Sequence, residues 1–231
     1  MENTLNSRVA VILRNGMAAD VRTDALVEFD ERSKLYQVAS IKGGKQRSYT
    51  WNCGKHLNQG NSGKCVGFAI AHEFAAAPKQ CNSSAGTANA IYNYAQKVDK
   101  YPDGPGTGTS LLAGCKAAKA MGWISAYNWC MGLQALISTV GYKGPVVIAV
   151  PWNASMNIPG KAGFLNPRGK FTARHALLCK GVNTKGGLFV LHNSWGTNWG
   201  KGGDCYITYG NMDTLLANGG EAVVFSGREC K

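Results

Sequence analysis

The pattern of apolar residues changes once along this chain, at Gly144–Pro145, and that change constrains the fold most strongly. Before it, apolar segments of helical length predict four helices, over 65–77, 86–98, 110–122 and 132–140. After it, short apolar runs between Gly- and Asn-rich turns predict five strands, over 146–150, 175–182, 187–193, 205–209 and 221–225. Helices followed by strands are typical of an α+β fold, and we expect a cleft where the two halves meet.

The N-terminal part differs from the remainder. Short apolar runs at 8–13, 25–29 and 34–40 predict strands, whereas a glycine-rich loop and then a helix follow Trp51. We therefore divide the chain into a strand-rich N-terminal extension, 1–48, and a domain over 49–231. With 231 residues the chain can bury a sizeable core, which favours one compact unit of two subdomains.

The formal net charge is +12, but the Lys and Arg residues are scattered and no run of five like charges occurs. The densest basic patch is 41–47. Nucleic-acid binding would require basic residues clustered with aromatic side chains or a known module, and the sequence has neither. We interpret the charge as a solvated basic surface and expect no specific nucleic-acid partner.

No apolar run approaches the roughly 18 residues of a membrane-spanning helix, so we expect no membrane association. The N-terminal sequence places Glu2 early and has a short apolar core from Val9 to Leu13, unlike a secretory signal. We therefore expect a cytoplasmic protein, or a virion-associated one if a phage particle carries it.

The chain contains eight cysteines. Without a secretory signal, we expect most of them to be reduced and buried. No C-x-x-C pair occurs, and the spacings of the histidines match no zinc template. The sequence therefore predicts neither a structural metal site nor a cofactor.

Cys65 is the candidate nucleophile. It follows the loop "QGNSGK" (59–64) and stands at the start of the apolar helix. A helix N-terminus and a neighbouring cation, here Lys64, both favour the thiolate over the thiol. The glycines Gly60 and Gly63 let this loop fold tightly and leave room for a substrate backbone.

His175 is the best candidate for the base that a thiol nucleophile needs, because it opens a strand in the second half and could reach across the cleft. His72 lies two turns further along the same helix as Cys65, so we expect it in the core. His56 lies in a loop, and His192 is expected to point away from its neighbour Asn193.

Two side-chain amides complete the candidate site. Asn193 could accept a hydrogen bond from the imidazole of His175 and fix its orientation, while Trp195 shields that ring from water. The side-chain amide of Gln59 and the backbone N–H of Cys65 could together hold the oxyanion of a tetrahedral intermediate.

These motifs together resemble the papain-like cysteine peptidases. The matching residues are Gln59-Gly60, Gly63, Cys65, Phe68, His175-Ala176, "NSWG" at 193–196 and "WGKGG" at 199–203. The resemblance runs from about residue 51 to 210, and the segments 108–123 and 144–150 look like the compact bacterial and phage branch.

The resemblance implies a helical left subdomain and a β right subdomain with the active site between them. It implies a cysteine endopeptidase that forms an acyl-enzyme on a peptide or protein substrate. The implied catalytic residues are Cys65 as nucleophile, His175 as general base and acid, Asn193 as orienting residue and Gln59 as oxyanion donor. The implied substrate contacts are a backbone edge at Gly106 or Gly108, a pocket at Ala173 and Ala176, and a leaving-group side at Trp195.

The sequence departs from the family pattern at three positions. Ser62 replaces a cysteine that usually forms a disulfide, and Val66 replaces an aromatic residue. Arg174 replaces Asn or Asp before the histidine, which is expected to bring a cation beside the imidazole. The first 48 residues are too few for the usual helical proregion, so we expect them to pack on the domain or occupy the cleft.

Two other functions are compatible with the same motifs. One is a non-catalytic peptide-binding or virion scaffold module on this fold. The other is a cysteine acyl-transfer enzyme, such as an amidase or transpeptidase, with the same machinery and another acceptor.

Overall fold

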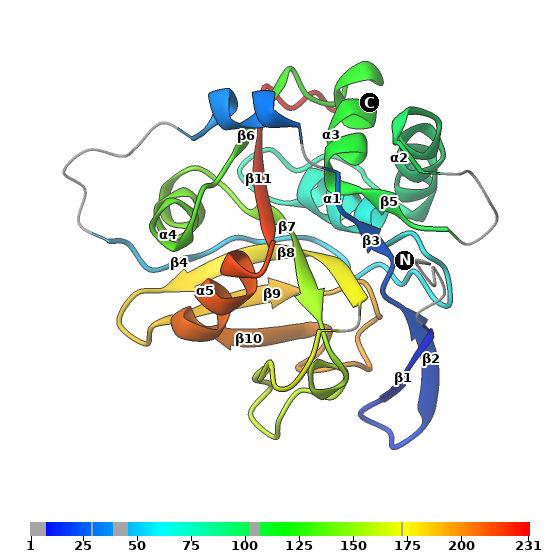
Figure 1. Cartoon of the computed structure of the whole chain (residues 1–231), viewed down its shortest axis with the longest axis vertical. Helices are drawn as coiled ribbons and strands as arrows, with labels where there is room; N and C mark the ends of the chain where they lie inside the picture. The colour runs from blue at the N-terminus through cyan, green and yellow to red at the C-terminus, as the bar shows by residue number, and fades with distance from the viewer. Residues whose placement is uncertain (1–7, 29, 39–45, 102–106, 172) are drawn as a thin grey trace.

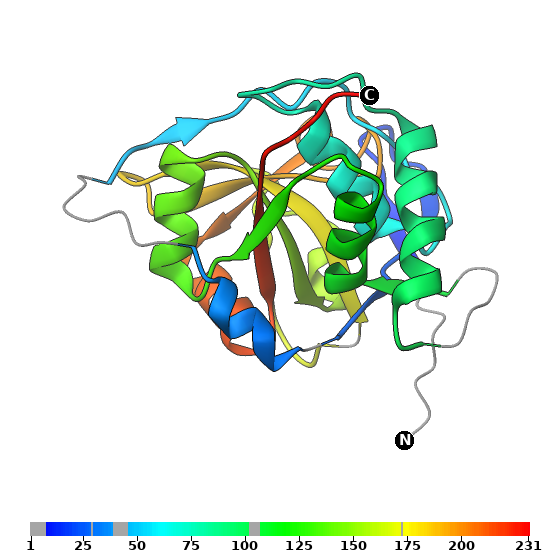
Figure 2. The ribbon, with the colours of Figure 1, turned by 90° about the horizontal axis from the view of Figure 1, so that it is seen from above.

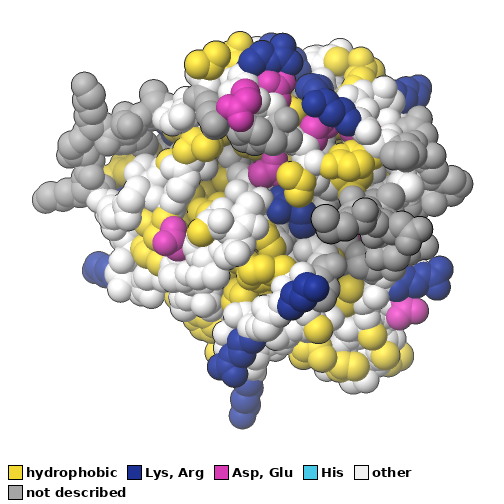
Figure 3. Space-filling view, in the orientation of Figure 1, with side chains coloured by type: hydrophobic (Ala, Val, Ile, Leu, Met, Phe, Trp, Pro, Cys, Tyr) yellow, Lys and Arg dark blue, Asp and Glu magenta, His cyan; other side chains and the backbone are white. Residues whose placement is uncertain are grey.

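The computed structural model describes residues 8–28, 30–38, 46–101, 107–171 and 173–231. A helical half lies against a half built on an antiparallel sheet, so the chain is an α+β protein as predicted (Figures 1 and 2). In the described part of the chain, no helix is long and apolar enough to cross a membrane. Lys and Arg side chains are scattered over the face shown in Figure 3, as expected for a solvated basic surface.

The helical half is organised around α1 (Cys65–Ala75). Nearly all of this helix is buried because nearly all of its side chains are apolar, and it contacts α2 (Ala85–Val98) on one side and the sheet on the other. Helix α3 (Leu111–Ala120) packs on α2, and its N-cap Ser110 accepts a hydrogen bond from Ala113 N at 3.0 Å. The predicted helices at these positions are confirmed.

The sheet has seven strands in the order β10-β9-β8-β7-β11-β6, with β4 paired to β8. Its strands are β4 (Tyr49–Thr50), β6 (Ala126–Trp129), β7 (Val146–Trp152), β8 (Ala173–Asn183), β9 (Leu188–His192), β10 (Asp204–Thr208) and β11 (Glu221–Ser226). The predicted turn at 183–187 joins β8 to β9. Strand β6 was not predicted, and it extends the sheet beside β11.

Two further helices contact the sheet. Helix α4 (Leu133–Tyr142) corresponds to the predicted fourth helix. Helix α5 (Tyr209–Ala217) was not predicted, and it begins at the last residue of the strand expected over 205–209. Its N-cap is Thr208, whose hydroxyl accepts a hydrogen bond from Asn211 N at 3.3 Å.

The N-terminal residues form a hairpin of β1 (Arg8–Ile12) and β2 (Ala18–Arg22). The chain then passes into β3 (Ala25–Leu26), which pairs in parallel with β5 (Thr109–Ser110) of the helical half. The strand expected over 34–40 is wrong over 34–36, because these residues belong to η1 (Glu31–Tyr36), which is a 3₁₀ helix. The N-cap of this helix is Asp30, whose carboxylate accepts a hydrogen bond from Arg32 N at 3.0 Å.

One disulfide joins Cys81, after α1, to Cys230 near the C-terminus. The other six cysteines are free and buried, as expected for most of them: Cys53, Cys65, Cys115, Cys130, Cys179 and Cys205.

Candidate active site

Cys65 is the first residue of α1 and is fully buried. Its neighbour Lys64 occupies the N-cap position without a side-chain capping bond, so the helix N-terminus remains electropositive beside the thiol. The ammonium of Lys64 donates to Asn89 Oδ1 of α2 at 2.9 Å.

His175 lies in β8 and is hydrogen bonded to Asn193, which follows β9. The His175 Nε2 and Asn193 Oδ1 atoms are 2.8 Å apart, and Ser194 N also donates to that oxygen at 2.8 Å. Because an amide oxygen only accepts, Nε2 carries the proton in the neutral ring. Nδ1 is buried and has no hydrogen-bond partner among the described residues, so its lone pair is available as a base.

Three tryptophans exclude water from His175. The centroid of the imidazole lies 4.6 Å from that of Trp195 and 5.0 Å from that of Trp152, and Trp199 packs on Trp195. Burial lowers the pKa of His175 from 6.5 to about 4, although the bond to Asn193 opposes this shift. The ring is therefore neutral near pH 7 in this conformation.

Gln59 is buried in the loop before α1. Its Nε2 donates to Ser62 O at 2.7 Å and to Arg22 O at 3.2 Å, and its Oε1 accepts from Ser194 Oγ at 2.6 Å. Ser194 therefore links the loop that carries Gln59 to the segment that carries Asn193. The sequence contains Ser194 inside "NSWG", but its role was not predicted, because hydrogen bonding across 135 residues has no local signal.

The N-terminal segment 22–26 lies between the two halves, where β3 pairs with β5 of the helical half and contacts β8 of the sheet. All five of its residues are buried. Asp24 is bridged to Arg174 of β8, and a Cβ on Gly108 would lie 1.5 Å from the carbonyl oxygen of Asp24. Only glycine permits this close backbone approach, so the segment occupies the backbone edge expected for a substrate.

Burial determines the protonation state of the Cys65 thiol. Burial raises the pKa of Cys65 from 9.0 to about 11, while hydrogen bonds with the backbone of Ala176 and Asp24 act in the opposite direction. With a high pKa for the thiol and a low pKa for His175, the proton stays on sulfur. The activated thiolate expected from the helix terminus is thus not the favoured state here.

The chain is similar to known proteins in its three-dimensional structure. No protein-family model and no curated protein matches the chain. Xylellain, a cysteine protease from Xylella fastidiosa, aligns over 99% of both chains with a TM-score of 0.65 and 15% identity. Procathepsin L 3 from Tenebrio molitor aligns over 83% of this chain and 74% of its own, with a TM-score of 0.59 and 15% identity. A recombinant stem bromelain precursor aligns over 98% of this chain and 80% of its own, with a TM-score of 0.57 and 15% identity.

This chain has the papain-like cysteine peptidase fold. At these identities the likeness shows the fold alone, and it supports the predicted arrangement of a helical half and a β half.

Within the papain-like fold, the remaining predicted substrate residues lie as follows. Gly63 is buried beside the start of α1, and Gly106 is outside the described residues. Ala173 is half-buried at the start of β8, and Ala176 is buried opposite Ala149 of β7. A largely apolar cavity of about 400 Å³ lies elsewhere, lined by residues that include Val27, Glu28, Trp129 and Glu221.

Arg174 does not place its charge beside the imidazole. Successive side chains of a strand point to opposite faces, so Arg174 points away from His175. Its guanidinium donates to Glu221 Oε2 at 3.0 Å and to Gly219 O at 2.8 Å. The cation is therefore neutralised by a carboxylate on β11, and the expectation of a cation beside the ring is wrong.

Proposed function

We propose that this protein is a cysteine peptidase that hydrolyses peptide bonds through an acyl-enzyme on Cys65. The observation that carries the proposal is the water-excluded hydrogen bond between His175 Nε2 and Asn193 Oδ1, which leaves Nδ1 unprotonated. The backbone of the next residue along β8, Ala176, acts to lower the pKa of the Cys65 thiol. The proposed base and the proposed nucleophile are both buried, which supports their acting in one water-excluded site.

The proposed reaction begins when His175 Nδ1 accepts the thiol proton and the thiolate attacks the carbonyl carbon of the substrate. The negative charge that develops on the carbonyl oxygen is held by Gln59 Nε2 and by the backbone N–H of Cys65. The C–N bond then breaks, and the imidazolium gives its proton to the leaving amine. Water, deprotonated by the same ring, attacks the thioester and releases the acid.

We also propose that residues 22–26 keep the site closed until they are displaced. Arg22 presents a peptide carbonyl to the amide of Gln59, and Asp24 fills the backbone edge at Gly108. Two of the matched structures are described as precursor forms, procathepsin L 3 and the stem bromelain precursor. A chain whose own segment fills the cleft is consistent with such a precursor.

Intact-mass spectrometry of the purified chain, with parallel assays on a fluorogenic peptide library, tests the function. We expect self-cleavage within the first 48 residues and peptide hydrolysis, and loss of both in Cys65→Ala. Peptide binding without turnover would support the scaffold alternative. Amide products formed with an added amine would support the acyl-transfer alternative. Equal turnover by the wild-type chain and folded Cys65→Ala would refute the assignment.

A further inference from the structure

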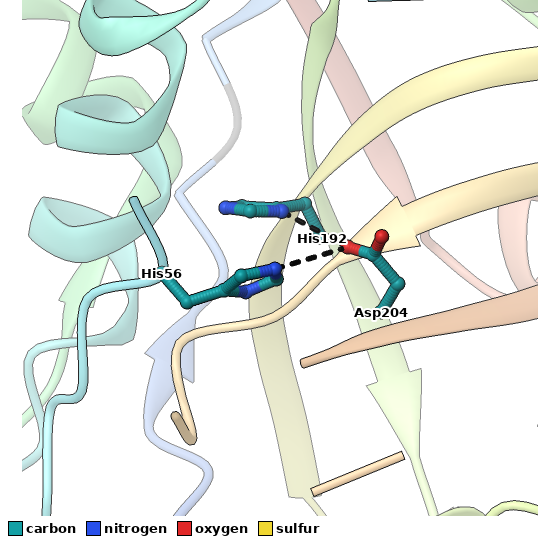
Figure 4. A group of neighbouring side chains, drawn as sticks. All are labelled: His56, His192 and Asp204. Atoms are coloured by element: carbon teal, nitrogen blue, oxygen red, sulfur yellow. Dashed lines mark hydrogen bonds and ion pairs between the residues drawn. The ribbon is translucent and has the colours of Figure 1, made fainter. Parts of the chain in front are cut away.

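A second cluster of ionisable side chains lies outside the candidate active site. His56 belongs to the loop before Gln59, His192 ends β9 and Asp204 begins β10 (Figure 4). His192 Nδ1 lies 2.9 Å and His56 Nε2 lies 3.6 Å from the same oxygen, Asp204 Oδ1. Each residue therefore turns one polar atom toward a common point.

The spacing of these three atoms suits a metal ion. They all lie within 4.8 Å of one another. Zinc forms bonds of about 2.0–2.2 Å to imidazole nitrogen and carboxylate oxygen, so two tetrahedral ligand atoms are roughly 3.3–3.5 Å apart. The observed distances of 2.9 and 3.6 Å bracket that value, so small side-chain movements would complete the geometry.

Hydrogen bonding within the described part of the chain satisfies only part of the cluster. The rings of His56 and His192 are stacked at 3.8 Å between centroids, and the ring of His72 contacts that of His192 at 4.4 Å. Each ring has one buried nitrogen with no partner among the described residues: His56 Nδ1, His72 Nδ1 and His192 Nε2. Leaving buried nitrogens without a hydrogen-bond partner in this way is costly.

His72 is not part of the ligand set, because its Nε2 already accepts a hydrogen bond from Leu57 N at 2.8 Å. Lys180 acts on the other carboxylate oxygen, since its Nζ lies 2.6 Å from Asp204 Oδ2. This contact orients Asp204 so that Oδ1 faces the imidazoles, as an outer contact of a metal ligand would. Its positive charge also weakens the site for a dication.

We propose that His56, His192 and Asp204 bind one transition-metal ion of the zinc class, with water in the fourth position. Imidazole and carboxylate ligands suit zinc. The side chains of His56 and Asp204 are 14% and 19% exposed, which gives the ion a path from solvent.

The ion would link two parts of the candidate active site. His56 lies three residues before Gln59, and His192 directly precedes Asn193. Asn193 N also donates to Gly203 O at 3.0 Å, next to Asp204. An ion held here would join the loop of Gln59 to the strand of Asn193 and would stabilise the folded chain. The spacing of these residues matches no zinc motif because the three ligands come from separate segments of the chain.

The test uses the full-length chain carrying Cys65→Ala, which removes the candidate nucleophile as a competing metal ligand. Calorimetric titration with Zn²⁺ is expected to show one site per chain, and Zn²⁺ is expected to raise the melting temperature. Co²⁺ is expected to give visible bands without the strong near-ultraviolet band of thiolate ligation. His56→Ala and Asp204→Asn, each checked for folding by circular dichroism, are expected to weaken binding at least tenfold.

Lys180→Met is a control variant that is expected to have the opposite effect on affinity. It removes a cation from the site, so Zn²⁺ should bind more tightly. The proposal is overturned if no site of 1:1 stoichiometry is found. It is also overturned if folded His56→Ala and Asp204→Asn bind Zn²⁺ as tightly as their parent. These outcomes do not bear on peptide hydrolysis, so the two proposals fail separately.

Discussion

The side-chain amide of Gln59 donates a 3.2 Å hydrogen bond to the backbone carbonyl oxygen of Arg22. The proposed oxyanion donor is therefore already bound to a peptide carbonyl, supplied by the chain's own N-terminal segment. Because Asp24 also contributes a backbone hydrogen bond to the Cys65 thiol, this segment contacts both the nucleophile and the oxyanion donor. Displacement of 22–26 would free both groups at once.

Gln59→Ala is expected to lower the kcat of the activated protein by roughly 10²–10³, with little change in KM, because the lost bond matters once the carbonyl oxygen is charged. Alkylation of the activated protein by a simple haloacetamide, which forms no oxyanion, should remain near the wild-type rate. Steady-state kinetics and alkylation are compared on the same preparation. Equal losses in both would indicate a distorted loop around Cys65 instead.

Ser194→Ala is expected to lower kcat by about fivefold, since the hydroxyl at 2.6 Å from Gln59 Oε1 holds the amide in place and a buried hydrogen bond contributes about 1 kcal/mol. Ser194→Thr retains the hydroxyl and should restore most of the rate. An unchanged kcat in Ser194→Ala, at unchanged KM, would show that Gln59 does not depend on Ser194.

The helices and strands of the candidate site were predictable because their signals are local. The apolar run of α1 starts at Cys65, and β8 and β9 carry His175 and lead to Asn193 as expected. The N-terminal segment was expected to pack on the domain or occupy the cleft, but its pairing was not predictable, since the two-residue strand β3 pairs with β5 more than 80 residues away.

The other differences between the predicted and the observed structure also depend on contacts between segments that are far apart in the sequence. Helix α5 begins at Tyr209, whose aromatic side chain favours a strand, and tertiary packing overrides that preference. The direction of Arg174 depends on Glu221, which lies two strands away in the sheet. The cluster of His56, His192 and Asp204 likewise forms only when distant segments meet.

In the intact chain, Cys65 is expected to be alkylated rapidly only at alkaline pH. Burial raises the pKa of this thiol to about 11, so thiolate forms only at high pH and the rate should rise steeply toward that value. Haloacetamide labelling at several pH values, with peptide mapping to separate Cys65 from the other free cysteines, measures the profile. A plateau already reached near neutral pH would contradict the closed state.

Ala25→Asp places a charge at a buried position of β3 and is expected to weaken docking of the segment, because the new carboxylate cannot be hydrated there. The alkylation profile of Cys65 should then shift to lower pH. Val27→Asp is the matched control, since Val27 is 50% exposed and the same charge there reaches water. A profile that is identical in Ala25→Asp and wild type would show that the segment does not control the thiol.

Arg174→Met is expected to destabilise the fold by about 3 kcal/mol, and more at pH 8 than at pH 5. Burial raises the pKa of Glu221 to about 7, and Arg174 opposes that shift, so removing Arg174 raises this pKa further. A carboxyl whose pKa is raised by folding contributes stability at low pH and loses it as the pH rises through the folded pKa. Urea unfolding at both pH values measures the effect.

The double variant Arg174→Met/Glu221→Gln separates charge from packing. It should recover much of the loss at pH 8, because no buried carboxylate is left without a partner. A loss in Arg174→Met that is equal at both pH values would indicate lost packing and not the ion pair.

The central claim is that Cys65 forms the acyl-enzyme, and trapping that intermediate tests it most directly. The activated protein is mixed with an activated peptide ester, quenched in acid within the first turnover and mapped by mass spectrometry. We expect one acyl group per chain, located on Cys65, and no adduct in His175→Ala on the same timescale. An acyl group on another residue, or ester turnover that persists in folded Cys65→Ala, would contradict the account.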